Sequence, residues 1–326
     1  MPESVDWDRL LELRESFIGA TPLESDYWAR PGTLESYDAT FAQRIGWKWD
    51  FVMKEVMKTG WSLPEGMPVC DWGCGSGIAG RIFLEYLKDS QNSLPDVYLW
   101  DRSAHAIAYA SGQLKEKFPG IRVHSGLPDD NAFYLVSHVM TELAPDQFGA
   151  LTDHLEKQAH GILWVEPGAY APARQLSQLH QRLTSKFHAW APCPDDGACP
   201  MMQPDRWEDW CHQFAPTPSQ VFQDPFWAAF SRILGVDLRS LPVSFLCLDK
   251  ASPSRDRSCS CRFLGRPRML KYQAEIHACF QGEFRSLVAS KRQNPSLYKT
   301  FKKGDFPSLA NVTESGGVID KCDGNL

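Results

Sequence analysis

The sequence predicts an α/β protein with a doubly wound, Rossmann-like parallel sheet. Two observations predict it: short apolar runs alternate with amphipathic segments, and the first apolar run, at 69–71, is followed by a glycine run at 73–77. Alternating strands and helices form parallel sheets because right-handed crossovers place helices on both faces. With 326 residues, of which 43% are hydrophobic, the chain can bury one large core or two modest ones.

A helical region precedes the first strand. Apolar residues recur at spacings of three and four in 6–19 and 36–58, which predicts a helix in each. The glycine run then lies between a strand at 69–71 and a helix at 79–87. Further strands are predicted at 97–100, 121–124, 133–138 and 161–166, and further helices at 104–117 and 171–186.

The periodicity stops after the last of these helices. Residues 187–235 contain seven prolines and three cysteines, so we expect an insertion rather than another strand and helix. Strand character returns at 243–248 and 274–280, and these two strands could complete the sheet. The expected organisation is an N-terminal helical region at 1–60, a methyltransferase-like Rossmann core at 61–186, a Cys/Pro-rich metal-binding insertion at 187–235, the last strands with a basic segment at 236–303, and a disordered tail at 304–326.

Charge is unevenly distributed along the chain. The segment 255–303 holds 12 Lys and Arg against three Asp and Glu, a balance of +9, so the rest of the chain carries −15 of the total of −6. An acidic body with a basic segment suggests that one face meets phosphate. The alternative is a solvated face with basic residues at helix ends.

Composition also limits the setting. No apolar run approaches the ~20 residues that span a bilayer, and the acidic N-terminus resembles neither a signal peptide nor a transit peptide. We therefore expect a cytoplasmic protein, from a bacterium. Ten cysteines in a chain of this length favour metal binding, with some thiols simply buried, over a disulfide scaffold.

The glycine run predicts a nucleotide-binding loop. Gly73, Gly75 and Gly77 let the backbone turn tightly after the strand and approach a ligand that a Cβ would block. Asp101 ends the second strand, where a carboxylate can accept both ribose hydroxyl protons. The G-x-G-x-G spacing, preceded by Asp71, is typical of S-adenosylmethionine-dependent methyltransferases rather than of dinucleotide enzymes. The alternative is a glycine-rich turn without a ligand.

No catalytic residue can be assigned. Amino-group methyltransferases often carry an Asn/Asp-Pro-Pro-aromatic signature after the fourth strand, and this chain has SHVMTEL at 137–143. His138 or Glu142 could act as a general base, but each could equally be a satisfied polar group at the end of a strand.

The cysteines indicate a metal site. Cys193, Cys199 and Cys211 supply three thiolates, and tetrahedral Zn²⁺ or an iron–sulfur cluster needs four ligands. Candidates for the fourth are Cys247, Cys259, Cys261 and Cys279, with His212 a further alternative. A C-x2-C knuckle is missing, which disfavours a zinc finger, and the alternative is a set of loop thiols without metal.

Several segments together carry a family resemblance. They are DWGCGSG at the glycine run, VSHVMTEL, WVEPGAYAPARQL, the set APCP, CP and WCHQF, and GRPRML, HACFQGEF, LYK and GDF near the C-terminus. In these segments the chain resembles the Rsm-twenty-two family of small-ribosomal-subunit assembly proteins, of the methyltransferase-like protein 17 type, and it would be a bacterial member. The resemblance covers roughly 35–305.

The resemblance implies a site and a role. It implies that Cys193, Cys199, Cys211 and Cys279 hold a 4Fe-4S cluster, and that the protein contacts small-subunit rRNA during assembly while binding S-adenosylmethionine. The chain departs from the family pattern at Asp195 and at Ala169-Tyr170, where the family often has His and Thr-Pro.

Two functions compete at this point. The first is an rRNA-contacting factor in ribosome biogenesis and translation, monomeric away from the ribosome and binding neither DNA nor membrane. The second is an active methyltransferase on rRNA or a small molecule, with a structural Zn²⁺ site. A zinc-stabilised binding module without S-adenosylmethionine is a weaker third, because the glycine run and Asp101 argue against it.

Overall fold

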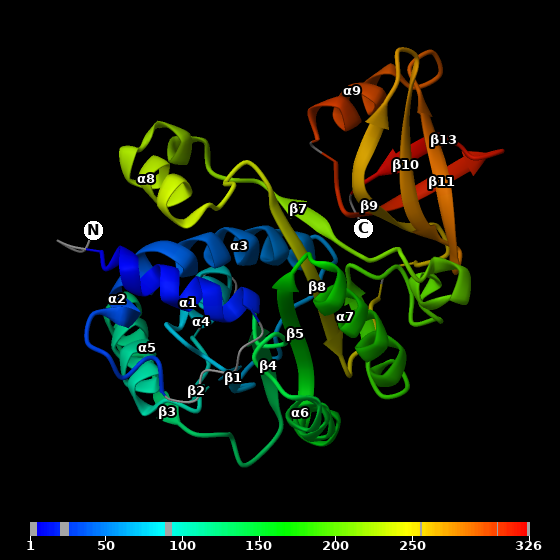
Figure 1. The fold of residues 1–326 in the computed structure, drawn as a ribbon. Helices are drawn as coiled ribbons and strands as arrows, with labels where there is room; N and C mark the ends of the chain where they lie inside the picture. Colours follow the sequence, from blue (N-terminus) through cyan, green and yellow to red (C-terminus); the bar gives the residue numbers. More distant parts are fainter. Residues whose placement is uncertain (1–4, 20–25, 89–92, 255, 305, 325–326) are drawn as a thin grey trace. The chain divides into compact units, whose positions relative to one another are not determined.

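The computed structural model describes residues 5–19, 26–88, 93–254, 256–304 and 306–324, which divide into two compact units (Figure 1). Unit 1 comprises residues up to 53, 63–165 and 215–241, and unit 2 comprises 54–62, 166–214 and the chain from 242 onward. In the described part of the chain, no helix is long and apolar enough to cross a membrane.

Unit 1 contains a parallel sheet in the order β3-β2-β1-β4-β5. This is the order of a doubly wound fold, in which ligands bind beyond the carboxyl ends of the strands where the order reverses. The reversal lies at β1, which pairs with both β2 and β4. The strands are β1 (Val69–Trp72), β2 (Val97–Trp100), β3 (Val123–Ser125), β4 (Ala132–Ser137) and β5 (Ala159–Pro167).

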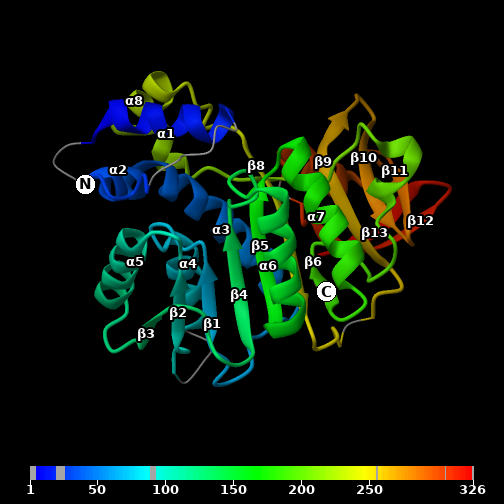
Figure 2. The ribbon, with the colours of Figure 1, turned by 60° about the horizontal axis from the view of Figure 1, so that its bottom comes forward.

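Helices cover both faces of this sheet. Successive residues of a strand point to opposite faces, and on β4 Phe133 stacks on Phe83 of α4 (Ile78–Leu87) while Tyr134 meets His154 of α6 (Pro145–Gln158). Figure 2 shows α6 in front of β4 and β5. The helix α5 (Ala104–Lys117) packs beside α4, and its first turn is capped by Ser103, whose hydroxyl accepts from the Ala106 N–H at 3.3 Å.

An aromatic-rich helical cluster completes unit 1. Leu10 and Leu13 of α1 (Trp7–Gly19) are buried together with Trp227 and Phe230 of α8 (Pro225–Leu234). Asp224 caps α8, Pro225 occupies its first position and Gly235 ends it in the left-handed conformation, a complete set of start and stop signals. The remaining helices are α2 (Thr33–Tyr37), the π-turn Asp38–Ala42, α3 (Gln43–Met57), most of which lies in unit 1, and the 3-10 turn Ser219–Gln223.

One part of unit 2 places a helix, two short strands and two 3-10 turns around one long strand. The strand β8 (Leu241–Asp249) pairs antiparallel with β6 (His188–Ala191), and β7 (Gln213–Ala215) also pairs with β8. The helix α7 (Tyr170–Leu183) precedes β6, and two 3-10 turns, Pro200–Met202 and Pro204–Arg206, lie between β6 and β7.

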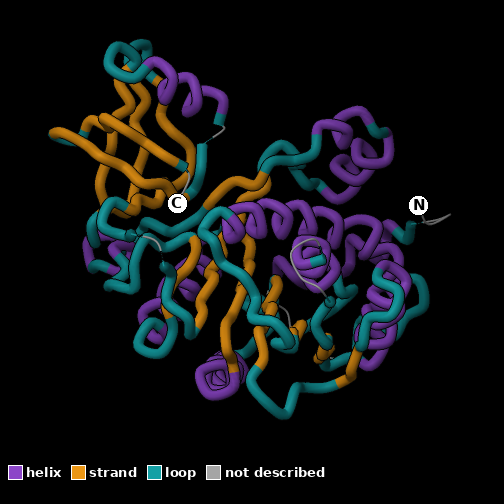
Figure 3. The backbone as a smooth tube through the Cα atoms, turned by 180° about the vertical axis from the view of Figure 1, so that it is seen from behind, coloured by secondary structure: helices purple, strands orange, loops and turns teal. Residues whose placement is uncertain are grey.

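The C-terminal part of unit 2 is a closed barrel in the order β10-β11-β13-β12-β9. Figure 3 shows its strands, in orange, closing on themselves beside one helix. The core is apolar and includes Phe263, Ile276 and Phe301. The elements are β9 (Ser260–Met269), β10 (Gln273–Phe280), β11 (Glu283–Ser290), α9 (Pro295–Lys303), β12 (Leu309–Ser315) and β13 (Val318–Asp323).

The structure matches most predicted elements and changes four expectations. The strand expected at 274–280 is β10 of the barrel, not part of the parallel sheet, because its partners are β9 and β11. Residues 309–323 of the expected disordered tail form β12 and β13, which the barrel stabilises by pairing. Of the expected insertion, 215–235 lies in unit 1, where α8 packs on α1. The helix α6 was not predicted, since few of its residues are buried apolar ones.

Candidate functional site

The glycine run forms the turn between β1 and α4 in unit 1. Gly73, Gly75 and Gly77 all have positive φ, at +69°, +49° and +77°. A Cβ on Gly77 would lie 2.9 Å from the Cβ of Ala110, so this glycine permits the close packing of α5. A Cβ on Gly75 would meet nothing within 4 Å. Gly75 therefore borders open space, as a glycine next to a ligand would.

Asp101 lies directly against the glycine run. Trp72 and Trp100 are register partners and their rings stack at 4.4 Å, which brings the ends of β1 and β2 together. The Asp101 carboxylate accepts the Gly75 N–H at Oδ2 (3.0 Å) and the Ser103 N–H at Oδ1 (2.9 Å). Burial raises the pKa of Asp101, and these two backbone donors act against that shift.

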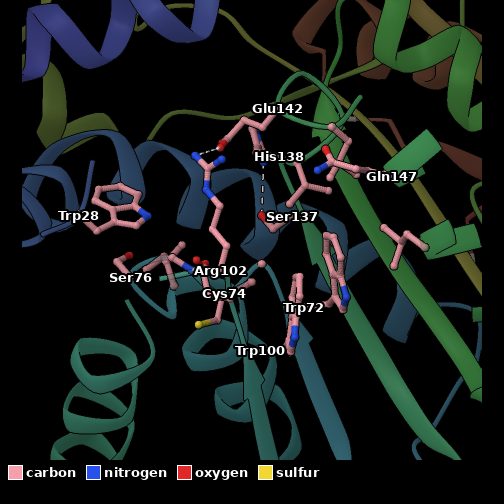
Figure 4. Close-up of a pocket in the computed structure, with 18 of the residues that line it drawn as sticks. Trp28, Trp72, Cys74, Ser76, Trp100, Arg102, Ser137, His138, Glu142 and Gln147 are labelled. Atoms are coloured by element: carbon pink, nitrogen blue, oxygen red, sulfur yellow. Dashed lines mark hydrogen bonds and ion pairs between the residues drawn. The ribbon is translucent and has the colours of Figure 1, made fainter. Parts of the chain in front are cut away.

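A cavity of about 450 Å³ opens beyond these strand ends (Figure 4). Its lining includes Gly73, Gly75 and Asp101, and it is closed by aromatic residues from the N-terminal helical region such as Trp28. The size lies within the range of small-molecule sites, and the position is the one expected of a doubly wound sheet.

Asp71 lies beneath the loop rather than in the cavity lining. Its fully buried carboxyl accepts the Gly80 N–H at 3.1 Å through Oδ2, and Oδ1 has no hydrogen-bond partner among the described residues. Burial raises the pKa of Asp71 to about 7, against the hydrogen bond from Gly80, which lowers it. A Cβ on Gly80 would lie 3.0 Å from Oδ2. Asp71 and Gly80 thus hold the loop to the first turn of α4.

The two base candidates have different surroundings. His138 has a positive φ of 55°, and its Nε2 lies 3.2 Å from Lys48 Nζ while Nδ1 lies 3.3 Å from Ser137 Oγ, so both ring nitrogens are engaged. Burial lowers the pKa of His138 well below its usual value. Glu142 faces the cavity, accepts from the Tyr27 hydroxyl at 2.8 Å and lies 3.7 Å from Arg102, and burial raises its pKa.

In unit 2, the four thiols named by the resemblance line one small cavity. Cys193, Cys199, Cys211 and Cys279 all border it. Cys211 and Cys279 are buried in a cluster with Met201 and Leu264, and the Cys279 thiol hydrogen-bonds to Cys211. Among the described residues, no three or more His, Cys, Asp or Glu side chains are arranged to hold a single metal ion.

Two charged or polar side chains that the sequence did not single out face the same cavity. Arg262 is 3% exposed, its Nη1 lies 3.8 Å from Cys193 Sγ, and its Nε has no hydrogen-bond partner among the described residues. The hydrogen bond from Cys279 lowers the pKa of Cys211, and the charges of Arg262 and His180 act in the same direction. No sequence signal marked Arg262 or His180, because neither belongs to a metal-ligand spacing pattern and only the fold brings them to Cys193 and Cys211.

The rival ligands lie elsewhere. Cys261 is buried in the barrel core and Cys259 contacts Ser258, so neither borders the cavity. Register explains the difference: Cys279 is opposite Arg262, facing outward from the barrel, whereas Cys261 is opposite Phe280, facing the barrel core. His212 is half-buried and stacks on Trp210, whereas the neighbouring Cys211 is buried, and His212 does not border the cavity.

Comparison with known proteins assigns the family. A family model described as mitochondrial small ribosomal subunit Rsm22 matches residues 104–308. The chain belongs to the Rsm22 family. No curated protein matches it.

Solved structures similar to this Rsm22-family chain include methyltransferases. The magnesium protoporphyrin IX methyltransferase from Synechocystis, solved with bound S-adenosylmethionine, is 13% identical with a TM-score of 0.39 and aligns over 76% of this chain and 100% of its own. The plantazolicin methyltransferase BamL, solved with S-adenosylhomocysteine, is 12% identical with a TM-score of 0.38, over 74% and 98%. Because these identities and TM-scores are low, the doubly wound fold of unit 1 is assigned from its own strand order and glycine run.

Asp195 and Tyr170, where the resemblance implied other residues, contact groups near the thiol-bearing segment 193–211. The Asp195 carbonyl lies 3.4 Å from His180 Nε2, and the Asp195 carboxylate accepts the Gly197 N–H at 2.7 Å. The Tyr170 hydroxyl donates to the Trp207 carbonyl at 2.5 Å. Asp195 thus contacts α7 and Gly197, and Tyr170 contacts Trp207.

Proposed function

We propose that the protein binds S-adenosylmethionine in unit 1 and a 4Fe-4S cluster in unit 2, and that it acts on the small ribosomal subunit in assembly and translation through rRNA contact. The family, whose name refers to a mitochondrial small ribosomal subunit, supports the ribosomal part. The basic residues of 256–303 would supply phosphate contacts. Arg255, also counted in that segment, lies outside the described residues.

The arrangement around Asp101 carries the cofactor proposal. Its two oxygens each accept one backbone N–H, and a carboxylate offers about four lone-pair sites. Two sites are thus left for the ribose hydroxyls of S-adenosylmethionine, while Gly75 leaves room for the ligand to approach. The resident cofactor would supply the methyl group of any transfer.

The donor set of unit 2 fits a cluster. Four thiols border one cavity, which is the ligand set of a 4Fe-4S cluster. Among the described residues, no group of three or more His, Cys, Asp or Glu is arranged to hold a metal ion, so support for the cluster comes from the four thiols and the cavity that they border. The buried Arg262 guanidinium would offset the negative charge of four thiolates. Cys193, Cys199 and Cys211 lie in the segment 193–211, and Cys279 lies in β10. A cluster shared by all four would therefore add its binding energy to the folding of both this segment and the barrel.

Three measurements test this proposal on the full chain. Calorimetry should give binding of S-adenosylmethionine and S-adenosylhomocysteine. Anaerobically purified protein should contain iron and sulfide with a charge-transfer absorption in the visible spectrum, whereas zinc without iron would support the Zn²⁺ alternative. The protein should co-sediment with small ribosomal subunits, and less so when Arg266, Arg268, Lys302 and Lys303 are all neutralised. Failure of the wild-type protein in all three would overturn the proposal.

An active methyltransferase is the second candidate, and Glu142 favours it. Its carboxylate faces the cavity and burial raises its pKa, as in a general base. Transfer of tritiated methyl from S-adenosylmethionine to small-subunit rRNA, with turnover lost in Glu142→Gln at unchanged cofactor affinity, would support this function. Absence of labelling in any rRNA or small-molecule fraction would leave a binding role.

A further inference from the structure

The C-terminal barrel has the topology of an OB-fold. In chain order the elements are β9, β10, β11, α9, β12 and β13, and the barrel closes as β10-β11-β13-β12-β9. The third and fifth strands pair in parallel, the first and fourth antiparallel, and the helix lies between the third and fourth. Barrels of this type bind oligonucleotides on the face of the second and third strands and with the adjoining loops.

Aromatic side chains occupy the exposed face of the segment that leads into β7. Cys211, Gln213 and Ala215 are buried, while the alternate residues Trp210, His212 and Phe214 are half-exposed. Trp210 stacks on His212 at 5.3 Å, and His212 meets Phe214 edge to face at 5.2 Å. Outward positions of a half-buried strand are normally polar, so three outward rings in succession require another explanation.

The aromatic series continues onto the barrel. The Gly265 N–H donates to the His212 carbonyl at 3.3 Å, which places β9 beside these rings. The Arg266 guanidinium lies 4.3 Å from the Phe214 ring centre, and Arg268 is the next outward residue of β9. Exposed aromatic rings are groups on which unstacked bases stack, and guanidinium groups beside them can contact the phosphates.

A second contact links β10 and β11 to the same segment. The centre of the His277 ring lies 5.0 Å from that of Phe284, and the Arg206 guanidinium lies 4.4 Å from the centre of the same Phe284 ring. Arg206 is followed by Trp207, which is 64% exposed, and Tyr170 binds the Trp207 carbonyl and meets Trp210.

Large exposed apolar side chains in the described part of unit 2 are all aromatic. Tyr170 is 44% exposed and lies next to Trp207, and Tyr272, in the loop between β9 and β10, is 67% exposed. Acidic groups are present too: Arg206 lies 3.7 Å from Asp205 and 3.5 Å from Asp209, and Arg268 lies 3.6 Å from Glu275. Positive charge for phosphates therefore comes mainly from the β9 end, where Arg266 and Lys271 are also exposed.

We infer that this surface, made of the outward rings of 207–214, the outer face of β9–β11 and the loop at Tyr272, binds single-stranded RNA by base stacking. The choice of RNA over DNA rests on the proposed function, whereas single-strandedness follows from the rings, because bases within a duplex cannot stack on protein side chains. The affinity of this surface for RNA would come partly from its aromatic rings, in addition to the basic residues of 256–303.

The test uses the full chain and fluorescein-labelled oligonucleotides, with Kd measured by anisotropy across a salt series. The wild-type protein should bind a single-stranded RNA of about a dozen nucleotides more tightly than a duplex RNA of equal length. Stacking contributes roughly 5- to 150-fold in affinity per base. Combining Trp207→Ala with Tyr272→Ala should therefore weaken binding at least 20-fold with an unchanged salt slope, and both rings are exposed enough that folding should persist.

Two further variants separate stacking from charge. Replacing Arg266 and Arg268 by Ala should reduce the salt slope by about two units, one for each lost phosphate contact. The control is Phe222→Ala, since Phe222 is 56% exposed but belongs to unit 1, and its affinity should match wild type.

Equal binding of single-stranded and duplex RNA, or an unchanged Kd in the folded Trp207 and Tyr272 double variant, would overturn the inference. If that variant binds RNA normally while the wild type co-sediments with small subunits, the surface is wrong and the proposed function stands. If single-stranded RNA binds as expected but no association with the small subunit occurs, the proposed function fails and the surface stands. Tighter binding of single-stranded DNA than RNA would also count against it.

Discussion

Replacing Asp101 by Ala should abolish tight binding of S-adenosylmethionine. The carboxylate accepts one backbone N–H at each oxygen, which leaves two acceptor sites for the ribose hydroxyls. A hydrogen bond to a charged group contributes about 1.5–3 kcal/mol, so the two together contribute about 3–6 kcal/mol. At 1.4 kcal/mol per factor of ten, the Kd should rise by roughly 100-fold or more. The loop also loses an acceptor for the Gly75 N–H, which adds to the effect.

The control for this change lies at the other end of the same strand. Asp96 immediately precedes β2 and its carboxylate contacts His124 at 3.2 Å and pairs with Arg122, so Asp96→Ala should leave the Kd unchanged. Asp101→Asn, which keeps the shape and one acceptor oxygen, should give an intermediate Kd. Calorimetry with S-adenosylhomocysteine, alongside thermal unfolding to check folding, measures all three variants. A Kd for Asp101→Ala within threefold of wild type would refute the assignment of Asp101 to the ribose.

Three further predictions follow from the same geometry. Gly75→Val should eliminate cofactor binding and lower the free energy of unfolding by about 1–3 kcal/mol, because φ is +49° there and the side chain would fill the open space; calorimetry and urea unfolding check it. Burial raises the pKa of Asp71 from 3.8 to about 7, so the folded state holds this proton more tightly and the stability of the wild type falls as pH rises through that window. Above it, Asp71→Asn should be more stable than the wild type by about 1–3 kcal/mol, which is the roughly 4 kcal/mol of the pKa shift less the cost of an unsatisfied amide. Urea titrations without ligand should show this difference growing from pH 4 to pH 8, and a constant difference would contradict the prediction. Cys279→Ser should release the metal and destabilise unit 2, whereas Cys261→Ser should keep full metal content by elemental analysis, and the reverse result would identify the wrong fourth ligand.

The local features of unit 1 were predictable because they depend on backbone signals that neighbouring residues supply. The strand at 97–100 and the helix at 104–117 have the predicted bounds. The positive φ of Gly75 and Gly77 likewise follows from residue type, since glycine adopts such values without a Cβ clash. Because the strands are parallel and short, Asp101 necessarily ends beside the glycine run.

Long-range pairing decided the rest. Composition predicted disorder after residue 304. The strands β12 and β13 form there because the barrel supplies pairing partners such as β9, which is too distant along the chain for local sequence patterns to reveal. The sequence left Cys247, Cys259, Cys261 and Cys279 as rivals on residue type alone. Register in β9 and β10 separates the last two: a strand alternates its side chains, so Cys279 and Arg262 face the cavity while Cys261 faces the barrel core. Residue order was enough to predict the glycine turn and Asp101 beside it, because both depend on local backbone signals. The meeting of the four thiols, the charge of Arg262 beside them and the grouping of the aromatic rings depend on contacts between segments far apart along the chain, so they follow from the fold.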